Sequence, residues 1–255
     1  MGDHYRSALV TGASSGIGWE YAKELAARGT NITIVARRTD RLEQLAAELT
    51  AVKVDVLTAD LSTDDGIAAI EQRLVDQPVE LLVNNAGVAN SGEFHTVDGS
   101  ALAGEVMLNV VALERLSHAA VGPMVRAGRG GILNVSSLAG EQPLRGLATY
   151  SATKAFVTRF SEALHSEVKG QGVHVTVLKP GYVWTEMNPG APEPKSFAGR
   201  FWLRAEDVAR HSLDAVEAGK LYSVPGPHWR LAAAAINALP GQLVRSLSTR
   251  VDTSS

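Results

Sequence analysis

The sequence predicts one α/β domain in which short apolar strands alternate with amphipathic helices. The clearest sign lies at the start of the chain. There the apolar run Ser7–Thr11 leads into a glycine-rich turn and then into a helical pattern that ends near Arg28. Further apolar runs and helical patterns alternate as far as Val224. A chain of 255 residues that is 45% hydrophobic and 20% charged can form a sizeable core.

Charge and composition exclude several classes of protein. The net charge of -3 gives no sign of the basic surface that nucleic-acid-binding proteins carry. The lack of cysteine excludes disulfides and thiolate chemistry, and it fits a reducing compartment. The first residues lack the apolar region of a signal peptide, and no apolar run approaches the roughly 18 residues of a membrane-spanning helix. We therefore expect a soluble cytoplasmic protein.

The turn after the first strand has the character of a phosphate-binding loop. It has the spacing Gly-x-x-x-Gly-x-Gly, and the residues of interest are Gly12, Ser14, Ser15, Gly16, Ile17 and Gly18. Glycines let the backbone turn sharply and approach a pyrophosphate, and the following helix offers free N–H groups and a positive dipole end. Three glycines alone are often an ordinary turn, but between a strand and a helix they indicate nucleotide binding.

Two arginines follow the second predicted strand, Asn31–Ala36. In dinucleotide-binding units an acidic residue about 20 positions past the glycines holds the ribose of NAD, whereas an arginine there accommodates the 2′-phosphate of NADP. This chain has Arg37 and Arg38 in that region, and the nearest acid, Asp40, is better placed to cap the next helix. The pattern favours NADP over NAD. The alternative is that the arginines only solvate a loop.

The third and fourth predicted strands, Val52–Val56 and Leu81–Val83, are also followed by residues that suit a nucleotide. Asp60 comes after the third strand and could accept a hydrogen bond from an adenine amino group. After the fourth strand, Asn85–Gly87 supplies small and amide residues that suit close packing beside a cofactor. Taken alone, the tetrapeptide Asn84–Gly87 is typical of an ordinary turn.

Polar residues at two further positions are candidates for the reaction centre. The helical pattern Asp98–Met124 contains Asn109, a poor residue for a helix interior. Asn109 has apolar neighbours on both sides, so we expect it to lie inside the protein. Ser137 follows the fifth predicted strand, Gly131–Ser136. Ligands of open α/β sheets bind outside the carboxyl ends of the strands, so a serine there is placed to hydrogen-bond a substrate.

Tyr150 and Lys154 open an apolar-periodic run that predicts a long helix through Val168. Residues four apart lie on the same face of a helix. A tyrosine with its ordinary pKa of about 10 is a poor acid or base at neutral pH, and a nearby cation lowers that pKa. The pair could therefore transfer a proton. Taken alone, a tyrosine and a lysine at this spacing are more often an ordinary helix face.

The end of the chain predicts a loop, a last strand and a tail. The sixth strand, Val173–Leu178, is followed by a non-periodic stretch at 186–204, which predicts a mobile lid. A last strand near Lys220–Val224 completes a domain of residues 1–224. Residues 225–255 predict an amphipathic helical tail, interrupted near Pro240, that docks on its own or a neighbouring subunit. Contact of this tail with a membrane surface is the less favoured alternative. The sequence has no metal-ligand spacing.

Together these segments resemble the short-chain dehydrogenase/reductase family over about Ser7–Val224. The residues that carry the resemblance are Thr11–Gly18, Asn84–Gly87, Asn109, Ser137, Tyr150 with Lys154, and Pro180–Gly181 with Thr185. The resemblance implies a Rossmann fold in a single domain, with a doubly wound parallel sheet of about seven strands and helices on both faces. It also implies a homotetramer or homodimer.

The resemblance implies roles for the site residues. Tyr150 would be the general acid or base, and Lys154 would lower the pKa of Tyr150 and hold the nicotinamide ribose. Ser137 would hydrogen-bond the substrate oxygen, and Asn109 would hold a water in a proton relay. The residues that would bind the cofactor are Gly12, Ser14, Ser15, Gly16, Ile17, Gly18, Arg37, Arg38, Asp60, Leu61, Asn85, Ala86, Gly87, Tyr150, Lys154, Pro180, Gly181, Val183 and Thr185.

One position departs from the family pattern. Many NADP-using members carry a basic residue where this chain has Ser15, so binding of the 2′-phosphate would fall to Arg37, Arg38 and Ser14. The resulting hypothesis is an NADP(H)-dependent oxidoreductase that acts on a small carbonyl or alcohol. The apolar residues of the 186–204 stretch favour a lipophilic substrate. The alternatives are an NAD-dependent dehydrogenase of the same family, a nucleotide-binding scaffold or redox sensor without turnover, and an isomerase or dehydratase.

Overall fold

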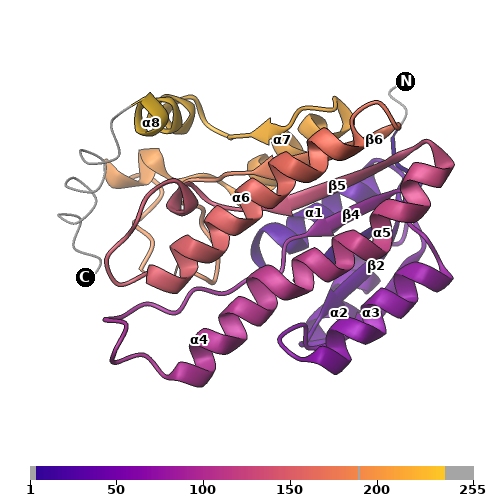
Figure 1. Ribbon diagram of the computed structural model, residues 1–255, viewed down its shortest axis with the longest axis horizontal. Coiled ribbons are helices and arrows are strands. Elements are labelled where there is room, and N and C mark those ends of the chain that lie inside the picture. Colours follow the sequence, from indigo (N-terminus) through magenta and orange to yellow (C-terminus); the bar gives the residue numbers. More distant parts are fainter. Residues whose placement is uncertain (1–3, 189, 239–255) are drawn as a thin grey trace.

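The chain forms a seven-stranded parallel sheet with helices on both faces (Figure 1). The computed structural model describes residues 4–188 and 190–238. The strands lie in the order β3-β2-β1-β4-β5-β6-β7, so the predicted doubly wound fold is confirmed. Their bounds are Ser7–Thr11 (β1), Asn31–Ala36 (β2), Val54–Thr58 (β3), Leu81–Asn84 (β4), Gly130–Val135 (β5), Val173–Leu178 (β6) and Tyr222–Ser223 (β7).

Two layers of helices cover the sheet. One layer consists of α1 (Gly16–Ala27), α2 (Thr39–Glu48) and α7 (Ala205–Glu217). On the other face lie α3 (Asp64–Asp76), α5 (Leu113–Ala127) and α6 (Ala148–Val168), with α4 (Gly99–Val106) packed against α6 (Figure 1).

Alternate residues of each central strand supply the two cores. Ala8 and Val10 of β1 pack under α1, α2 and α7, whereas Leu9 between them packs under α3 and α5. Leu82 of β4 likewise belongs to the second core. Successive strand side chains point to opposite faces of a sheet, so a central strand must be apolar throughout. Full burial of a valine or leucine side chain contributes about 1.5–3 kcal/mol.

Two local predictions about the strand and helix starts are wrong. The third strand begins at Val54, not at Val52, because its pairing with β2 runs from Ile32 opposite Val54 to Ala36 opposite Thr58. Asp40 does not cap α2. The capping position is Arg38 and the helix begins at Thr39, which places Asp40 in the first turn. A negative charge there still interacts favourably with the helix dipole.

The predicted helix Asp98–Met124 is continuous, but the middle of it is not regular α-helix. Asp98 caps its start by accepting a hydrogen bond from the N–H of Ala101 at 2.9 Å. Between α4 and α5 the backbone widens into a π-helical segment, Met107–Ala112, and Asn109 lies within it. Such segments are frequent at functional sites because they re-aim side chains of the helix.

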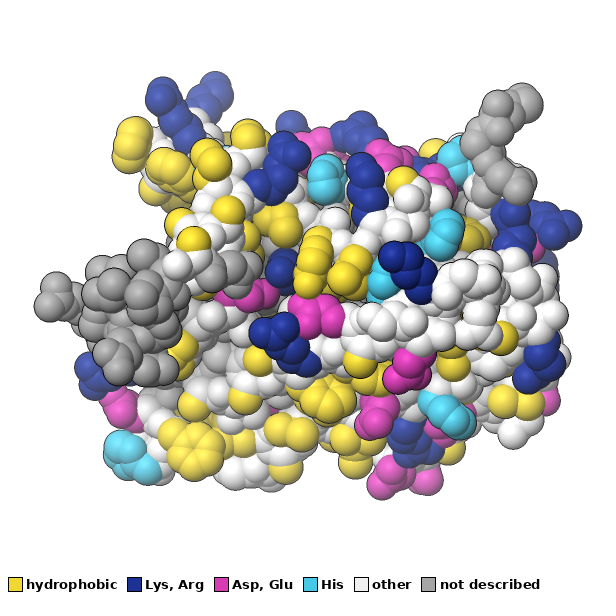
Figure 2. Space-filling model, turned by 45° about the horizontal axis from the view of Figure 1, so that its top comes forward, with side chains coloured by type: hydrophobic (Ala, Val, Ile, Leu, Met, Phe, Trp, Pro, Cys, Tyr) yellow, Lys and Arg dark blue, Asp and Glu magenta, His cyan; other side chains and the backbone are white. Residues whose placement is uncertain are grey.

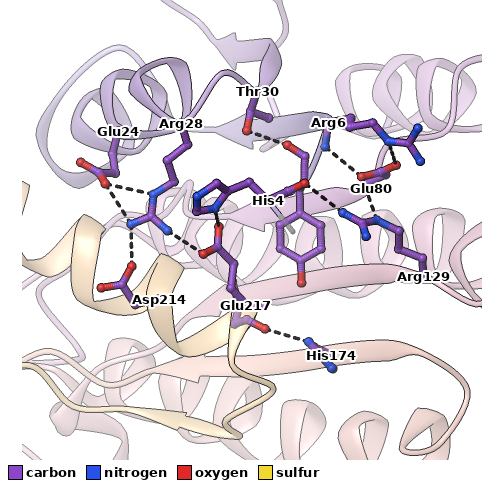
Figure 3. A network of polar contacts seen from close by, with 12 residues as sticks. His4, Arg6, Glu24, Arg28, Thr30, Glu80, Arg129, His174, Asp214 and Glu217 are labelled. Atoms are coloured by element: carbon purple, nitrogen blue, oxygen red, sulfur yellow. Dashed lines mark hydrogen bonds and ion pairs between the residues drawn. The ribbon is translucent and has the colours of Figure 1, made fainter. Parts of the chain in front are cut away.

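A polar network fastens the sheet at the amino ends of its strands (Figure 3). Arg28, at the end of α1, pairs with Glu24 of its own helix and with Asp214 and Glu217 of α7 at 2.7 to 2.9 Å. On the same edge, Glu80 accepts hydrogen bonds from neighbouring arginines. These contacts join elements distant in sequence, at the edge of the sheet opposite to the carboxyl ends of the strands.

The last described helix is α8 (Pro227–Ala238). Figure 2 shows hydrophobic and basic side chains next to one another over the corner of the molecule that α8 occupies. Leu231 of this helix is 73% exposed. The predicted continuation of the tail past Pro240 lies outside the described residues. Within 4–188 and 190–238, no helix combines the length and the apolar character needed to cross a membrane.

Candidate active site

A cavity of about 600 Å³ lies where the strand order reverses, at the carboxyl ends of β1 and β4. Ligands of doubly wound sheets bind at this switch point. The cavity brings together almost every residue predicted for the site. Those that line it are Gly12, Ser14, Ser15, Gly16, Ile17, Arg37, Arg38, Asp60, Leu61, Asn85, Ala86, Gly87, Ser137, Tyr150, Lys154, Pro180, Gly181, Val183 and Thr185.

The glycine loop forms one wall of the cavity. Gly12 and Gly16 have φ angles of +68° and +56°, in the left-handed region that favours glycine. A Cβ on Gly18 would lie 2.2 Å from the carbonyl oxygen of Gly12, so Gly18 serves close packing behind the loop and is not among the lining residues. The side chain of Ser15 caps no N–H of α1. The first N–H groups of this helix can therefore serve an anion.

The loop after β4 forms the adjoining wall, and Thr11 fixes it. The hydroxyl of Thr11 accepts hydrogen bonds from the N–H groups of Asn85 and Ala86, both at 3.0 Å. The amide of Asn85 donates to the Thr11 carbonyl at 2.9 Å. The Asn85 side chain is thus committed to holding the two loops together, which positions the cavity wall for a ligand.

Positive charge gathers at the end of the cavity beside β2. Arg38 donates to the hydroxyl and the carbonyl oxygen of Ser14, both at 3.2 Å, and pairs with Glu186 at 3.0 Å. Arg37 lies 3.9 Å from Asp60. Hydrogen bonds from Ser62 lower the pKa of Asp60, and the charge of Arg37 adds to this. One oxygen of Asp60 is therefore already occupied by Ser62, a partner that the sequence did not indicate.

At the other end of the cavity, Tyr150 meets Ser137. Burial raises the pKa of Tyr150 above its ordinary value, a hydrogen bond with Ser137 lowers it in part, and the charge of Glu105 raises it. The Ser137 hydroxyl also accepts a hydrogen bond from the N–H of Ala139 at 3.1 Å. Both hydroxyl groups face the same cavity, so they can act together on one ligand atom.

Lys154 lies one helical turn after Tyr150, as the spacing predicts. Its ammonium donates to the carbonyl oxygen of Val135 at 2.9 Å and lies 5.7 Å from the centre of the Tyr150 ring. Burial lowers the pKa of Lys154 to about 8. The expected lowering of the Tyr150 pKa by Lys154 is not seen, because burial dominates the shift of Tyr150.

Asn109 lies behind the cavity wall and is 1% exposed. Its amide donates to the carbonyl of Val88 at 2.9 Å and to the hydroxyl of Thr153 at 3.1 Å, and its oxygen accepts from the N–H of Val88 at 3.0 Å. A Cβ on Gly87 would lie 3.1 Å from the Asn109 oxygen and 3.4 Å from the Lys154 nitrogen. The two polar groups therefore flank Gly87, and a larger residue there would crowd both.

Aromatic side chains hold the stretch after β6. Trp202 stacks on Tyr182 with ring centres 5.0 Å apart, and Trp184 lies 6.1 Å from Trp202. Trp229 of α8 packs edge-on against Tyr182 and donates to the Phe201 carbonyl at 2.8 Å. Tyr182, Trp184 and Trp229 were not predicted as site residues, and they support the cavity without lining it. The signal available was the density of aromatic residues in this part of a chain that is only 5% aromatic.

Glu186, Met187 and Asn188 also line the cavity, and they belong to the 186–204 stretch predicted as a lid. The lining residues that were not predicted are Val35, Ala36, Ala59, Val88, Ala89, Leu108, Val135 and Ser136. Most are apolar, and no residue type marks them out before the fold is known. As a whole, the cavity offers a helix N-terminus, a cationic end and a pair of hydroxyl groups. This donor set fits a phosphate-containing dinucleotide with a carbonyl or alcohol beside it.

Comparisons with known proteins agree with this geometry. The family model described as short chain dehydrogenase matches residues 6–195. The chain therefore belongs to the short-chain dehydrogenase family. The predicted family is confirmed, and with it the Rossmann fold.

Individual family members resemble the chain over different lengths. A very-long-chain 3-oxoacyl-CoA reductase of Anas platyrhynchos is 36% identical over 71% of this chain and 61% of the reductase, so the chain spans less than two thirds of that relative. A short-chain dehydrogenase from Sphingobium yanoikuyae, solved with NADPH, has a TM-score of 0.82, 32% identity and coverage of 98% and 97%. A bulky-bulky ketone specific alcohol dehydrogenase from Comamonas testosteroni has a TM-score of 0.80, 32% identity and coverage of 98% and 96%.

Proposed function

We propose that the chain is an NADP(H)-dependent oxidoreductase that interconverts a carbonyl and an alcohol, with Tyr150 as general acid or base. The observation that carries the proposal is the composition of one cavity. Tyr150, Ser137 and Lys154 line one end of it, and Arg37 and Arg38 line the other. A reduced dinucleotide would span these two ends.

Each part of the cofactor has residues to hold it. The glycine loop and the start of α1 would bind the pyrophosphate. Arg38, oriented by Ser14, would meet the 2′-phosphate with charge-assisted hydrogen bonds. Lys154 would hold the nicotinamide ribose, and Val183 with Thr185 would fix the carboxamide. When bound, the nicotinamide supplies or accepts the hydride, and the protein positions it.

The chemical work of the chain is to handle one proton and one developing charge. Tyr150 is protonated at neutral pH, because its ordinary pKa is about 10 and burial raises it, so its hydroxyl can donate a hydrogen bond to a carbonyl oxygen. The Ser137 hydroxyl would donate to the same oxygen, where negative charge develops during reduction. The Lys154 ammonium would stabilise the phenolate left behind, because opposite charges close together favour the ionised form.

A lipophilic carbonyl compound is the proposed substrate. Apolar residues line the wall beside the reaction centre: Val88, Ala89, Leu108 and Met187. The 186–204 stretch, held by the Trp202 and Tyr182 stack, would close over a bulky group as a lid. The two relatives named for very-long-chain 3-oxoacyl-CoA and for bulky ketones support this substrate class.

A two-way substrate screen tests the proposal. Purified protein is given NADPH or NADH with ketones of increasing bulk, and consumption of the reduced cofactor is followed by absorbance. The proposal predicts turnover with NADPH that rises from small to bulky aromatic ketones. Tight NADPH binding with no turnover on any ketone or alcohol would instead favour a nucleotide-binding scaffold. Equal turnover of small charged ketones would contradict the substrate class.

A further inference from the structure

Glu105 is a fully buried carboxylate near the reaction centre. It lies in α4 with 0% exposure. Acidic side chains are almost never fully buried unless paired, because a charge removed from water loses its hydration. Glu105 was not predicted as a site residue and does not line the cavity.

Only one of its two oxygens has hydrogen-bond partners among the described residues. The oxygen Oε2 accepts from the backbone N–H of Asn90 at 3.0 Å and from the Asn90 side chain at 2.9 Å. The oxygen Oε1 is buried and has no hydrogen-bond partner within the described part of the chain. Anchoring Asn90 needs only a neutral acceptor, such as the amide oxygen of a glutamine. Holding the loop therefore does not explain a buried negative charge.

The surroundings of Glu105 connect it to the reaction centre. Asn109 lies about one turn after Glu105 in the same continuous helix. Its side chain hydrogen-bonds the backbone of Val88, just as the side chain of Glu105 hydrogen-bonds Asn90. The two residues thus fix the loop that carries Gly87, and Gly87 lies between Asn109 and Lys154. α4 also packs directly against α6, the helix of Tyr150 and Lys154.

Among the described residues, Glu105 is the charged side chain that acts on both members of the pair. Its negative charge raises the pKa of Tyr150, and it also raises the pKa of Lys154 against the larger lowering by burial. Asn90, Asn109 and Thr153, which contact or adjoin Glu105 and Lys154, carry no charge. The segment after Ser137 also packs on α6 and carries Glu141, but that carboxylate is paired with Lys179 at 3.1 Å. Glu105 has no cation among its hydrogen-bond partners within the described residues.

We propose that Glu105 is a positioning residue that sets the pH range in which the Tyr150–Lys154 pair keeps its transferable proton. The proposal rests on the proposed function of that pair. A buried negative charge favours the protonated forms of both groups, so the pair retains its proton to higher pH. Loss of the charge should therefore move the pKa values of both groups downward.

The variant Glu105→Gln tests the negative charge of Glu105 separately from its hydrogen bonds to Asn90. The glutamine oxygen can still accept from the Asn90 N–H, whereas the negative charge is lost. For the NADPH-dependent reduction of a ketone, the upper limb of the pH profile of kcat/KM should move down by about one pH unit. Asn90→Ala is the matched control. It removes one hydrogen bond to Glu105 and leaves the charge, so the limb should stay in place.

A second neutral variant guards against failure to fold. Glu105→Met has similar size, and apolar replacement of a buried charge is often tolerated. It should move the limb in the same direction as Glu105→Gln. A rate loss in both variants with the limb unmoved would overturn the proposal and leave Glu105 a loop anchor.

A readout without turnover distinguishes this proposal from the proposed function. Carbon NMR of lysine-labelled protein follows the titration of Lys154, assigned by loss of its signal in Lys154→Arg. Lys154 should titrate near pH 8 in the wild type and lower in Glu105→Gln. An inactive wild type with this shift would refute the function and keep the inference. An unchanged Lys154 titration would refute the inference.

Discussion

Arg38 Nη1 lies 3.0 Å from Glu186 Oε2, and this ion pair joins the two sides of the cavity at its cationic end. Arg38 follows β2, whereas Glu186 follows Thr185 in the stretch after β6. The carboxylate faces the arginine that would receive the 2′-phosphate of NADP. A phosphate at this position would therefore compete with Glu186 for the guanidinium.

Arg38→Ala should weaken NADPH binding by about 10- to 100-fold, because a charge-assisted hydrogen bond contributes about 1.5–3 kcal/mol. NADH affinity should hardly change, since NADH lacks the 2′-phosphate. A fluorescence titration with both nucleotides measures this. Arg6→Ala is the control, because Arg6 is exposed at the opposite edge of the sheet. Equal loss of affinity for both nucleotides would remove Arg38 from the 2′-phosphate site.

Glu186→Gln should bind NADPH a few-fold more tightly than the wild type. The substitution removes the negative charge that competes with the 2′-phosphate, and a like charge nearby disfavours anion binding. NADH affinity should remain the same. The same titration measures both constants. Weaker NADPH binding in this variant would mean that Glu186 supports the phosphate site and does not compete with it.

Much of this site could be predicted from the sequence because its residues lie at the ends of strands. Ser137 and Gly87 each follow a predicted strand, and parallel strands bring their carboxyl ends to one edge. Glu105 and Glu186 could not be predicted in the same way. Whether a helical glutamate faces water or the core depends on the packing of α4 against α6, and the pairing of Glu186 with Arg38 depends on a loop without periodic pattern. The wrong start of β3 has a related cause, because its bounds follow from pairing with β2.

The pH dependence of carbonyl reduction follows from the two pKa shifts at the reaction centre. The pKa of Lys154 is lowered to about 8 and that of Tyr150 is raised, so Lys154 loses its charge near pH 8 while Tyr150 is still protonated. The charged ammonium stabilises the phenolate that forms as Tyr150 donates its proton, so kcat/KM should be level below about pH 8 and fall about tenfold per pH unit above it. In Lys154→Met, kcat/KM should no longer fall near pH 8. If kcat/KM of the wild type stayed level up to two pH units above pH 8, the titration of Lys154 would not control the reduction.

Arg28→Met should destabilise the fold without acting on the site. The variant leaves Glu24, Asp214 and Glu217 without their shared cation, whose side chain is 10% exposed (Figure 3). Breaking a mostly buried pair leaves unpaired charge, and we expect a loss of about 2 kcal/mol in the free energy of unfolding. Denaturant unfolding measures it. Arg159→Met, at an exposed helix pair, is the control and should lose under about 1 kcal/mol.

The central claim is that Tyr150 supplies the proton for carbonyl reduction. The most direct measurement compares the wild type with Tyr150→Phe in the NADPH-dependent reduction of a bulky aromatic ketone, beside an NADPH titration of each protein. Loss of the hydroxyl should lower kcat by at least about a hundredfold while the NADPH dissociation constant changes little. Tyr222→Phe serves as a control for tyrosine removal away from the cavity. Retention of most of the activity in Tyr150→Phe would contradict the account.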